Sequence, residues 1–275
     1  MTPINEQESA RIELFARRLR VSVLDMLAQA GSGHLAGSLD MADVLATLYA
    51  HVLRCNPDDP VWEKRDRLVL SNGHIAPVLY AALAHAGFFP LEELASLRSF
   101  GSRLQGHPER TKVPGVETTS GPLGEGLPQA AGIALGGKLD RASFRTYCIT
   151  SDGEHECGIL WEAVLFASRH RLSTLTNIVA RNGIQIGGST EEVMPLEPLV
   201  QKYEAFNWHV LEVDGHNVEM FVDALGQAEL ETERPSVIIA HTIPGKGVPE
   251  IEGKYEWHGK VPTKEQAERW IRELR

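Results

Sequence analysis

Two turns, each placed directly after an apolar run, most constrain the fold of this chain. The run at 146–150 precedes Asp152, and the run at 176–180 precedes Asn182. A helix-like stretch, 158–172, separates them. This order predicts a parallel βαβ unit, in which both strands end at the same edge of the sheet. Asp152 and Asn182, 30 residues apart in the sequence, are therefore expected to meet around one ligand.

The same alternation of strand-like and helix-like segments continues along the chain. It predicts a doubly wound α/β fold with a mainly parallel sheet and helices on both faces. Without a linker, repeat or low-complexity tract, residues 1–275 are expected to form one domain. Further strands are predicted at 67–70, 208–213 and 236–240, helices at 8–30, 41–53, 76–86 and from 121–126 to 138, and a long loop at 100–120.

Charge and composition exclude several classes of partner. The formal net charge of −10 argues against nucleic acid or an anionic membrane surface. The N-terminal segment 1–8 is polar, unlike a signal peptide, and no apolar run approaches the about 20 residues of a membrane span. Cys55, Cys148 and Cys157 are scattered and form neither a disulfide framework nor a zinc pattern. These features predict a cytoplasmic protein.

The residue types at the two turns suit a metal ion. A carboxylate, an amide oxygen and a nearby backbone carbonyl are hard oxygen donors for Mg²⁺ or Ca²⁺. Asp-Gly after a strand is usually only a turn. A second turn after a strand, at Asn182, supplies another oxygen donor and strengthens the prediction of a metal site. Gly153 lets the backbone come close to a phosphate, and the helix that follows presents free N–H groups. Together the turns predict a metal-bridged diphosphate.

Five histidines fall in loop-like segments, most of them beside glycine or proline. A single loop histidine is most often solvent-facing or structural, but several at strand ends indicate a binding crevice at the sheet edge. Imidazoles there can hydrogen-bond hydroxyls or phosphates and move protons near neutral pH. No short His or Cys spacing supports zinc. The five are His34, His74, His107, His241 and His258.

Two glycine-rich segments allow both a structural and a functional reading. The segment 121–126 is either a rigid turn into a helix or a backbone wall against a flat ring or diphosphate. The segment 245–247 is either a flexible loop or a phosphate contact, and it lacks the P-loop pattern. The sequence contains no nucleophile elbow and no Rossmann fingerprint after its first strand.

Taken in order, these motifs resemble the N-terminal, diphosphate-binding domain of transketolase, a thiamine diphosphate enzyme. The resemblance covers nearly the whole chain, and as a set the motifs are highly specific. The motifs that carry it are 33–39, 65–74, 105–108, 121–124, 152–153 with 161–163, 182–185, 213–216, and 245–247 with 257–259.

The resemblance implies thiamine diphosphate as the cofactor, with Mg²⁺ or Ca²⁺ held by Asp152, Asn182 and the carbonyl of Ile184. It also implies two overlapping sets of contact residues. The implied cofactor contacts are His74, Gly121, Leu123, Gly153, Glu154, Asn182 and His258. The implied catalytic residues are His34, His74, His107 and His258.

The resemblance further implies a divided enzyme. A full transketolase chain is far longer, because it also carries a pyrimidine-binding and a C-terminal domain. The family's glutamate that activates the aminopyrimidine lies in that part. The chain is therefore expected to be the N-terminal subunit of a split transketolase, inactive alone and joined to a C-terminal subunit in an α2β2 assembly. It would move a two-carbon ketol unit from a ketose to an aldose, phosphorylated or not.

Four positions depart from the family's pattern, and three of the changes delete an acidic residue. The departures are Ser151 for glycine, Cys157 for glutamate, and Ala180 and Gly187 for aspartate. The metal ligands are retained, so metal-dependent cofactor binding is expected with altered affinity or altered coupling to the partner. Two alternatives stay open: a degenerate, non-catalytic scaffold subunit, and a subunit of a 2-oxo acid dehydrogenase. The latter shares the Asp…Asn pair but is not expected to share the Gly-His motifs.

Overall fold

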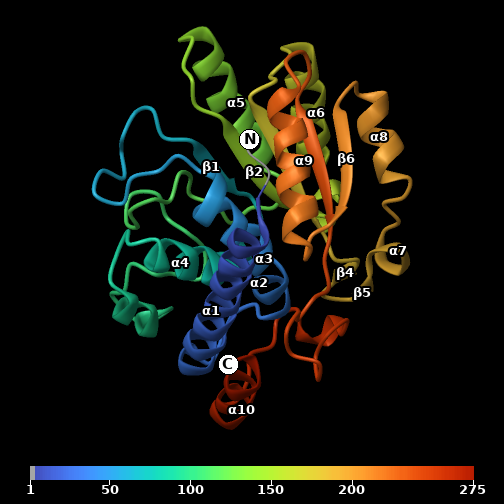
Figure 1. Cartoon of the computed structure of the whole chain (residues 1–275). Coiled ribbons are helices and arrows are strands. Elements are labelled where there is room, and N and C mark those ends of the chain that lie inside the picture. Colours follow the sequence, from blue (N-terminus) through green and yellow to red (C-terminus); the bar gives the residue numbers. More distant parts are fainter. Residues whose placement is uncertain (1–3) are drawn as a thin grey trace.

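The computed structural model describes residues 4–275 and contains a five-stranded, wholly parallel sheet in the order β1-β2-β3-β7-β6 (Figure 1). The doubly wound α/β fold is confirmed. A small antiparallel pair, β4 and β5, lies beyond the end of β3. The strands are β1 (Arg67–Leu70), β2 (Thr146–Ser151), β3 (Leu175–Arg181), β4 (Ile184–Gln185), β5 (Gly188–Ser189), β6 (His209–Asp214) and β7 (Ser236–His241). The first three residues of the polar N-terminal segment lie outside the described residues.

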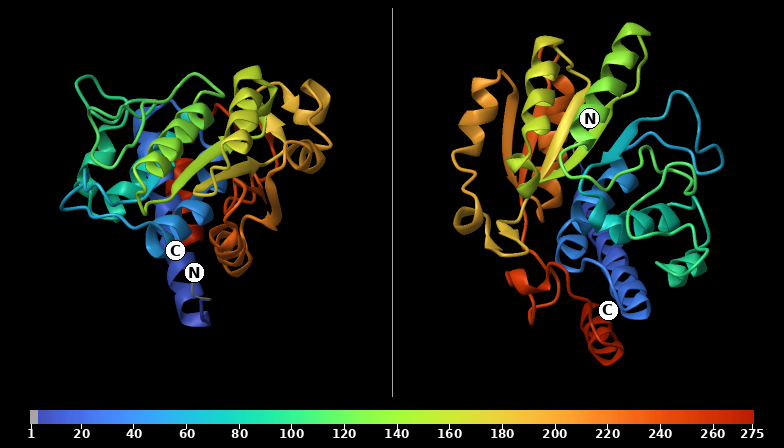
Figure 2. Two further views of the ribbon diagram at one scale, coloured as in Figure 1. Left: turned by 90° about the horizontal axis from the view of Figure 1, so that it is seen from above. Right: turned by 180° about the vertical axis from the view of Figure 1, so that it is seen from behind.

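Helices cover both faces of the sheet (Figure 2). One face carries α1 (Glu6–Ala30), α2 (Ala36–Asp40), α3 (Ala42–Thr47), α4 (Ala76–His85), α9 (Val218–Leu230) and, packed on α1, α10 (Lys264–Leu274). The other face carries α5 (Gly126–Leu139), α6 (Gly158–Arg169) and α8 (Leu199–Ala205). The short helix α7 (Thr190–Val193) follows β5.

The strands form because alternate side chains enter two separate cores. In β3, Ile178 and Ala180 join the core beneath α1 to α4, whereas Val179 joins the core beneath α5 and α6. Cys148 and Ile149 divide in the same way in β2. Each fully buried aliphatic side chain contributes about 1.5–3 kcal/mol. A strand covered on both faces therefore appears in the sequence as an unbroken apolar run.

The strand register brings the two predicted turns together. Ser151 at the end of β2 is paired with Ala180 near the end of β3. Asp152 and Asn182 follow these positions, and the Asp152 N–H donates to the Ala180 carbonyl at 3.2 Å. Both turns therefore leave the sheet at its carboxyl edge, as the sequence predicts.

The predicted helix at 41–53 is wrong in its boundaries. The chain becomes helical at Ala36, breaks at Met41 (φ −83°, ψ 4°), and ends in a π-helical turn, Leu48–Val52. All residues from 35 to 48 are buried, so no periodic pattern marks where the helix begins or breaks. A contact from Asp40 to a distant turn, described below, accompanies the break.

Other expectations differ by only a few residues. The helix expected from 121–126 begins at Gly126, because the preceding segment is a loop in which Gly124 has a φ of +81°. The segment 100–120 contains neither helix nor strand, as expected. Gly31 ends α1 with a φ of +66° and donates its N–H to the Leu27 carbonyl at 3.0 Å. Helices α7 to α10 and the β4–β5 pair were not assigned from the sequence.

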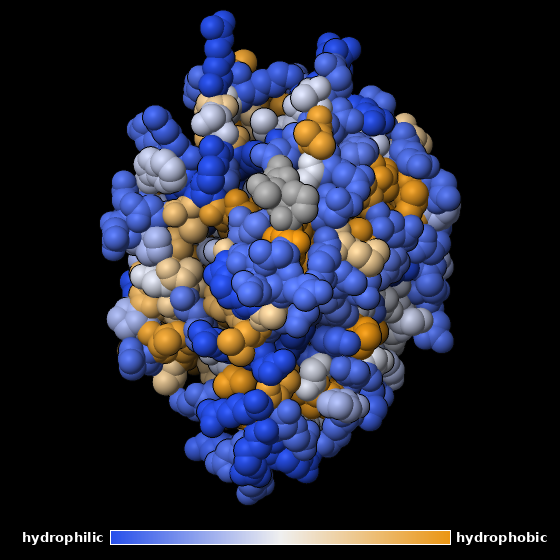
Figure 3. All heavy atoms as spheres, in the orientation of Figure 1, coloured by the Kyte–Doolittle hydropathy of each residue, from blue (hydrophilic) through white to orange (hydrophobic). Residues whose placement is uncertain are grey.

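The surface is mainly hydrophilic on the face shown in Figure 3, where apolar side chains form separate patches. In the described part of the chain, no helix combines the length and the apolar character that crossing a membrane requires.

Candidate functional site

A cavity of about 600 Å³ opens at the carboxyl ends of β1, β2 and β3. Ten of the eleven site residues expected from the sequence line it, and so do all four departures from the family's pattern. The ten are His34, His74, His107, Gly121, Leu123, Asp152, Gly153, Asn182, Ile184 and His258. The four are Ser151, Cys157, Ala180 and Gly187.

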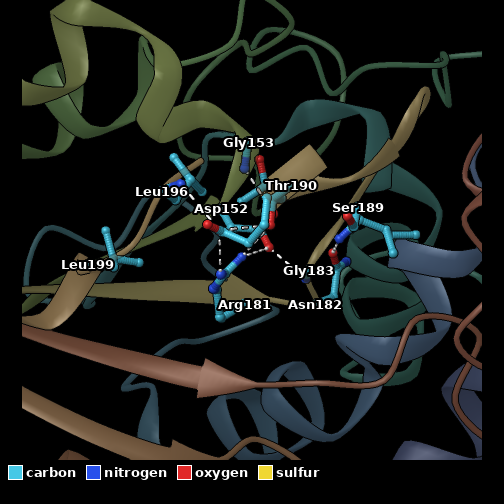
Figure 4. A network of polar contacts seen from close by, with 12 residues as sticks. Asp152, Gly153, Arg181, Asn182, Gly183, Ser189, Thr190, Leu196 and Leu199 are labelled. Carbon is cyan, nitrogen blue, oxygen red and sulfur yellow. Dashed lines mark hydrogen bonds and ion pairs between the residues drawn. The ribbon is translucent and has the colours of Figure 1, made fainter. Parts of the chain in front are cut away.

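Asp152 lies at the centre of a network of donors (Figure 4). Its Oδ1 accepts from the Gly153 N–H at 2.9 Å. Its Oδ2 accepts from the Gly183 N–H at 2.7 Å and from the Arg181 guanidinium at 3.1 Å. Burial raises the pKa of Asp152, and these donors partly offset that effect. The carboxylate is therefore held in one orientation at the cavity wall.

Arg181 connects this turn to the segment 184–197. Its guanidinium donates to the Thr190 hydroxyl at 2.8 Å and forms ion pairs with Glu191 at 3.1 Å and Glu197 at 2.9 Å. The Arg181 side chain is only 10% exposed, so solvent screens its pair with Asp152 weakly. Arg181 thereby fastens the β4–β5 pair and α7 beside the cavity.

Asn182 is fixed through both atoms of its amide. The Ile184 N–H donates to Oδ1 at 3.1 Å, and Nδ2 donates to Oδ2 of Asp40 at 2.8 Å. A backbone N–H can only donate, so the amide oxygen must be the atom that faces Ile184. Asp40 is fully buried at the end of α2, and burial raises its pKa well above its usual range.

These oxygens fit a divalent cation. A carboxylate offers about four lone pairs, and Asp152 uses three, which leaves one on Oδ1. Asn182 Oδ1 accepts one bond and keeps a second lone pair. Within residues 4–275, no group of three or more His, Cys, Asp or Glu side chains is arranged to hold a metal. The residues present suit a hard cation whose remaining ligands come from a bound anion and water.

Three histidines form a cluster among the residues that line the cavity. Ring centroids lie 4.9 Å apart for His34 and His74, 5.4 Å for His34 and His258, and 5.2 Å for His74 and His258. Burial, reinforced by neighbouring histidines, lowers the pKa of His34 to about 4 and of His74 to about 3. Burial also lowers the pKa of His107 and His258. All four imidazoles are therefore neutral near pH 7.

Several polar atoms that line the cavity are buried without a partner. They are Nδ1 of His34, Oδ1 of Asp40 and Oδ1 of Asn72. An unsatisfied buried polar atom costs about 1–3 kcal/mol, so native proteins rarely keep such atoms without a use. Three of the ten such atoms among the described residues belong to the lining of this cavity, where a polar ligand or bound water can satisfy them.

Glu154 lies behind the cavity wall rather than on it. It is fully buried, and its carboxylate accepts from the Ser71 hydroxyl at 2.5 Å, the Gly124 N–H at 2.8 Å and the Ser151 N–H at 2.7 Å. The structure therefore gives Glu154 the task of bracing the 121–126 segment against the turn after β2. Its implied contact with the cofactor would be indirect.

His241 also lies apart from the cavity. It pairs with Glu212 at 2.7 Å, and both side chains are about half exposed. The 245–247 segment does not line the cavity either. Sequence reasoning about strand ends alone could not separate His241 from the four histidines that do line it.

Five residues of the site were not singled out from the sequence. Asn72, Glu156 and Gln185 line the cavity, and Gln185 donates to Glu156. Asp40 carried a signal, because it is one of two acids, with Asp43, inside a stretch of small and apolar residues. Arg181 carried a weaker one, as a cation at the end of a buried strand.

Fold and cavity together define a class of protein: a parallel α/β domain with a polar cavity at the carboxyl edge of its sheet. Oxygen donors and neutral histidines line that cavity. The chain matches the family described as "Transketolase, thiamine diphosphate binding domain" over residues 12–273. The chain belongs to the transketolase family.

Relatives of two lengths are similar to it. The 6-deoxy-6-sulfo-D-fructose transketolase subunit SqwG of Clostridium sp. (strain MSTE9) is 42% identical over 259 residues, which cover 94% of each chain. One subunit of the apulose-4-phosphate transketolase of Phocaeicola vulgatus is 39% identical over 96% of this chain and 93% of that protein. Human transketolase is 41% identical over 98% of this chain but only 43% of its own length.

A solved structure gives the same relation. The crystal structure of transketolase from Campylobacter jejuni superposes with a TM-score of 0.90 at 35% identity, and the match covers 98% of this chain and 43% of that one. The chain thus spans somewhat less than half of the full-length transketolases and nearly all of the relatives named as subunits. The family match and these relatives confirm the resemblance to transketolase. They do not support the alternative of a 2-oxo acid dehydrogenase subunit.

Proposed function

We propose that this chain is the thiamine diphosphate-binding subunit of a two-subunit transketolase, folded as a single domain over residues 1–275. The reaction is transfer of a two-carbon ketol unit from a ketose to an aldose. The observation that carries the proposal is the cavity, which combines the oxygen donors of Asp152 and Asn182 with four neutral histidines. The similarity to two relatives named as transketolase subunits supports the division into two chains.

Asp152, Asn182 and the carbonyl of Ile184 would hold Mg²⁺ or Ca²⁺, and the metal would hold the cofactor's diphosphate. Gly153, Gly121 and Leu123 line the cavity. Gly153 would approach the diphosphate, and Gly121 and Leu123 would border the cofactor's aminopyrimidine ring. The chemistry that bound thiamine diphosphate supplies is nucleophilic addition and storage of electrons during C–C cleavage. The protein supplies position and electrostatics.

The histidines would act on the hydroxyl groups of the sugar. Because they are neutral near pH 7, each imidazole can accept a proton at one nitrogen and donate at the other. Nδ1 of His34 is buried and unpaired, so it is available to a substrate hydroxyl. His107 and His258, with less strongly lowered pKa values than His74, are the candidates for accepting a proton as the C–C bond breaks.

The cavity wall of this chain contains no lysine or arginine among the described lining residues. Arg98 is close enough to His34 and His107 to lower their pKa but does not line the cavity, so a phosphate or sulfonate on the sugar would meet its cationic partner elsewhere. We assign that recognition to the second subunit. The identity of the sugar, phosphorylated or not, follows from that subunit rather than from this one.

The rim of the cavity offers an apolar surface for the partner. Leu123 is 46% exposed, Ile186 is 76% exposed, and both line the cavity. Ile159 is 41% exposed and lies beside Gly124, where a Cβ would come within 3.3 Å of its side chain. A C-terminal transketolase subunit seated on this rim, in an α2β2 assembly, would close the cavity and exclude water.

The test is turnover with and without the second chain. The purified chain alone should bind no ketose productively, and ketol transfer should appear when the product of a neighbouring reading frame with the pyrimidine-binding and C-terminal domains is added. Full turnover by the single chain would refute the divided enzyme. Size-exclusion chromatography with light scattering would measure the stoichiometry.

A non-catalytic scaffold subunit is the second candidate. The observation that favours it is the position of the four departures, all of which line the cavity. Calorimetry separates the two functions, because a scaffold would show no binding heat for thiamine diphosphate with Mg²⁺ when the partner is present.

A cytoplasmic location stays a prediction from the sequence.

A further inference from the structure

Position 180, two residues before Asn182, carries alanine, so β3 brings no acidic side chain to this part of the cavity. Ala180 is 2% exposed and lines the cavity. Its methyl group belongs to the same core cluster as Leu39 and Met41. Ala180 therefore contributes no carboxylate at the place where β3 and α2 meet beside the cavity.

An acid enters this region from α2 instead. Asp40 lies between Leu39 and Met41 in the sequence, is fully buried, and lines the cavity. Its Oδ2 accepts from Nδ2 of Asn182 at 2.8 Å across 142 residues of sequence. Its Oδ1 has no hydrogen-bond partner among the described residues. One oxygen thus holds the predicted metal ligand, and the Thr242 hydroxyl acts on the same carboxyl group and lowers its pKa against the effect of burial.

We propose that Asp40 is the positioning residue of the metal site and supplies the acidic group that position 180 lacks. This inference rests on the proposed cofactor site. Asp40 fixes the amide plane of Asn182 from one side, while the Ile184 N–H fixes it from the other. Groups that orient a ligand in this way typically change metal affinity about 10–100-fold when they are removed.

A purely structural role makes a different prediction. A buried carboxylate that only joins α2 to the turn after β3 would alter the unfolding midpoint of the metal-free protein, and no acid at position 180 could replace it in metal binding. Restoration of metal affinity by Ala180→Asp in an Asp40→Ala chain is therefore the distinguishing result, because only the missing acidic group is returned.

The experiment measures Mn²⁺ binding by electron paramagnetic resonance at saturating thiamine diphosphate, with the full chain and its partner subunit. Asp40→Ala should weaken Mn²⁺ binding about 10–100-fold, and Asp40→Ala/Ala180→Asp should recover most of that loss. Asp25→Ala is the matched control, because it removes the same charge from an exposed position on α1 and should leave affinity unchanged. Asp40→Asn keeps the size and an acceptor oxygen, so it should fold and still weaken binding.

Wild-type affinity in Asp40→Asn, or in a folded Asp40→Ala chain, would overturn the inference and leave the proposed function intact. A folded double variant that recovers nothing would also overturn it, in favour of the structural role. If Asp40→Ala or the double variant does not fold, Asp40→Asn alone decides. Absence of Mn²⁺ binding by the wild-type assembly would refute the proposed cofactor site and this inference with it.

Discussion

Two groups of histidines differ in how their ring nitrogens are used: the buried His155 alone, and the half-buried cluster of His34, His74 and His258. On the α6 and α8 side of the sheet, His155 bonds through both nitrogens: Nδ1 lies 2.9 Å from the Ser151 carbonyl, and Nε2 lies 2.8 Å from the Tyr203 hydroxyl. At the cavity, His34, His74 and His258 contact one another but form no hydrogen bond to any described residue. Both sets have pKa values lowered mainly by burial.

A lowered pKa caused by burial is therefore common to both groups of histidines, whereas unused ring nitrogens occur only in the cavity group, to which the proposed function assigns a catalytic role. The His155 network is complete, because Asn177 also donates to the Tyr203 hydroxyl at 3.1 Å and accepts from Thr150 at 3.2 Å. A complete buried network rigidifies what it touches, here the turn that carries Asp152. The comparison predicts that substitutions of the cavity histidines lower turnover with little effect on the free energy of unfolding. Substitutions in the His155 network should lower the free energy of unfolding with little effect on turnover.

The largest effect is expected at the cavity histidines. His107→Ala and His258→Ala should each lower ketol-transfer turnover between about 10²- and 10⁴-fold, the range for loss of a general acid or base. Thiamine diphosphate affinity should change far less. Steady-state kinetics with the partner subunit, together with calorimetric titration of the cofactor, measures both. Unchanged turnover in both variants would refute the assignment of protons to these imidazoles.

The next effect concerns Asp152, the proposed metal ligand. Asp152→Ala should weaken metal affinity about 100-fold or more, beyond what loss of an orienting neighbour causes. The fold should persist, because Arg181 keeps its pairs with Glu191 and Glu197. Circular dichroism checks the fold, and Mn²⁺ titration measures the affinity. Retained affinity in a folded variant would place the metal elsewhere.

The network predicts the opposite pattern. Tyr203→Phe leaves Nε2 of His155 and Nδ2 of Asn177 without their shared partner, at a cost of about 2 kcal/mol. Urea unfolding measures this loss, and Tyr255→Phe, at a 40% exposed tyrosine, is the matched control. Turnover by the folded variant should stay close to wild type. A large loss of turnover without loss of stability would break the distinction between the two sets.

The smallest effect is a pH dependence of stability. Burial lowers the pKa of His155 from 6.5 to about 4, so the unfolded chain takes up the proton first as the pH falls. Stability from this group is complete above pH 6.5 and is lost between pH 6.5 and pH 4, with about 1 kcal/mol gone at pH 5.5. Urea unfolding at pH 7 and pH 5.5 should show the loss, and His155→Gln should show a smaller one. An equal loss in both proteins would remove His155 as its source.

Local sequence signals predicted the sheet edge well. The apolar runs at β2 and β3 and the turns that follow them were visible because each is encoded by adjacent residues. The partners of those turns were not visible, since Asp40 reaches Asn182 across 142 residues and Glu154 meets Ser71 across 83. Helix boundaries between 36 and 52 were missed because burial on every side removes the period that marks them.

Glu154 has a consequence for protein engineering. Its carboxylate joins the loop after β1, the turn after β2 and the 121–126 segment, and at Gly126 a Cβ would lie only 2.5 Å from the Cα of Ser71. A combinatorial library that varies these loops independently would consist mostly of incompatible combinations. The contacts described here link positions 71, 124, 126, 151 and 154. Transfer of this part of the cavity to another protein would therefore require all five residues to be transferred together.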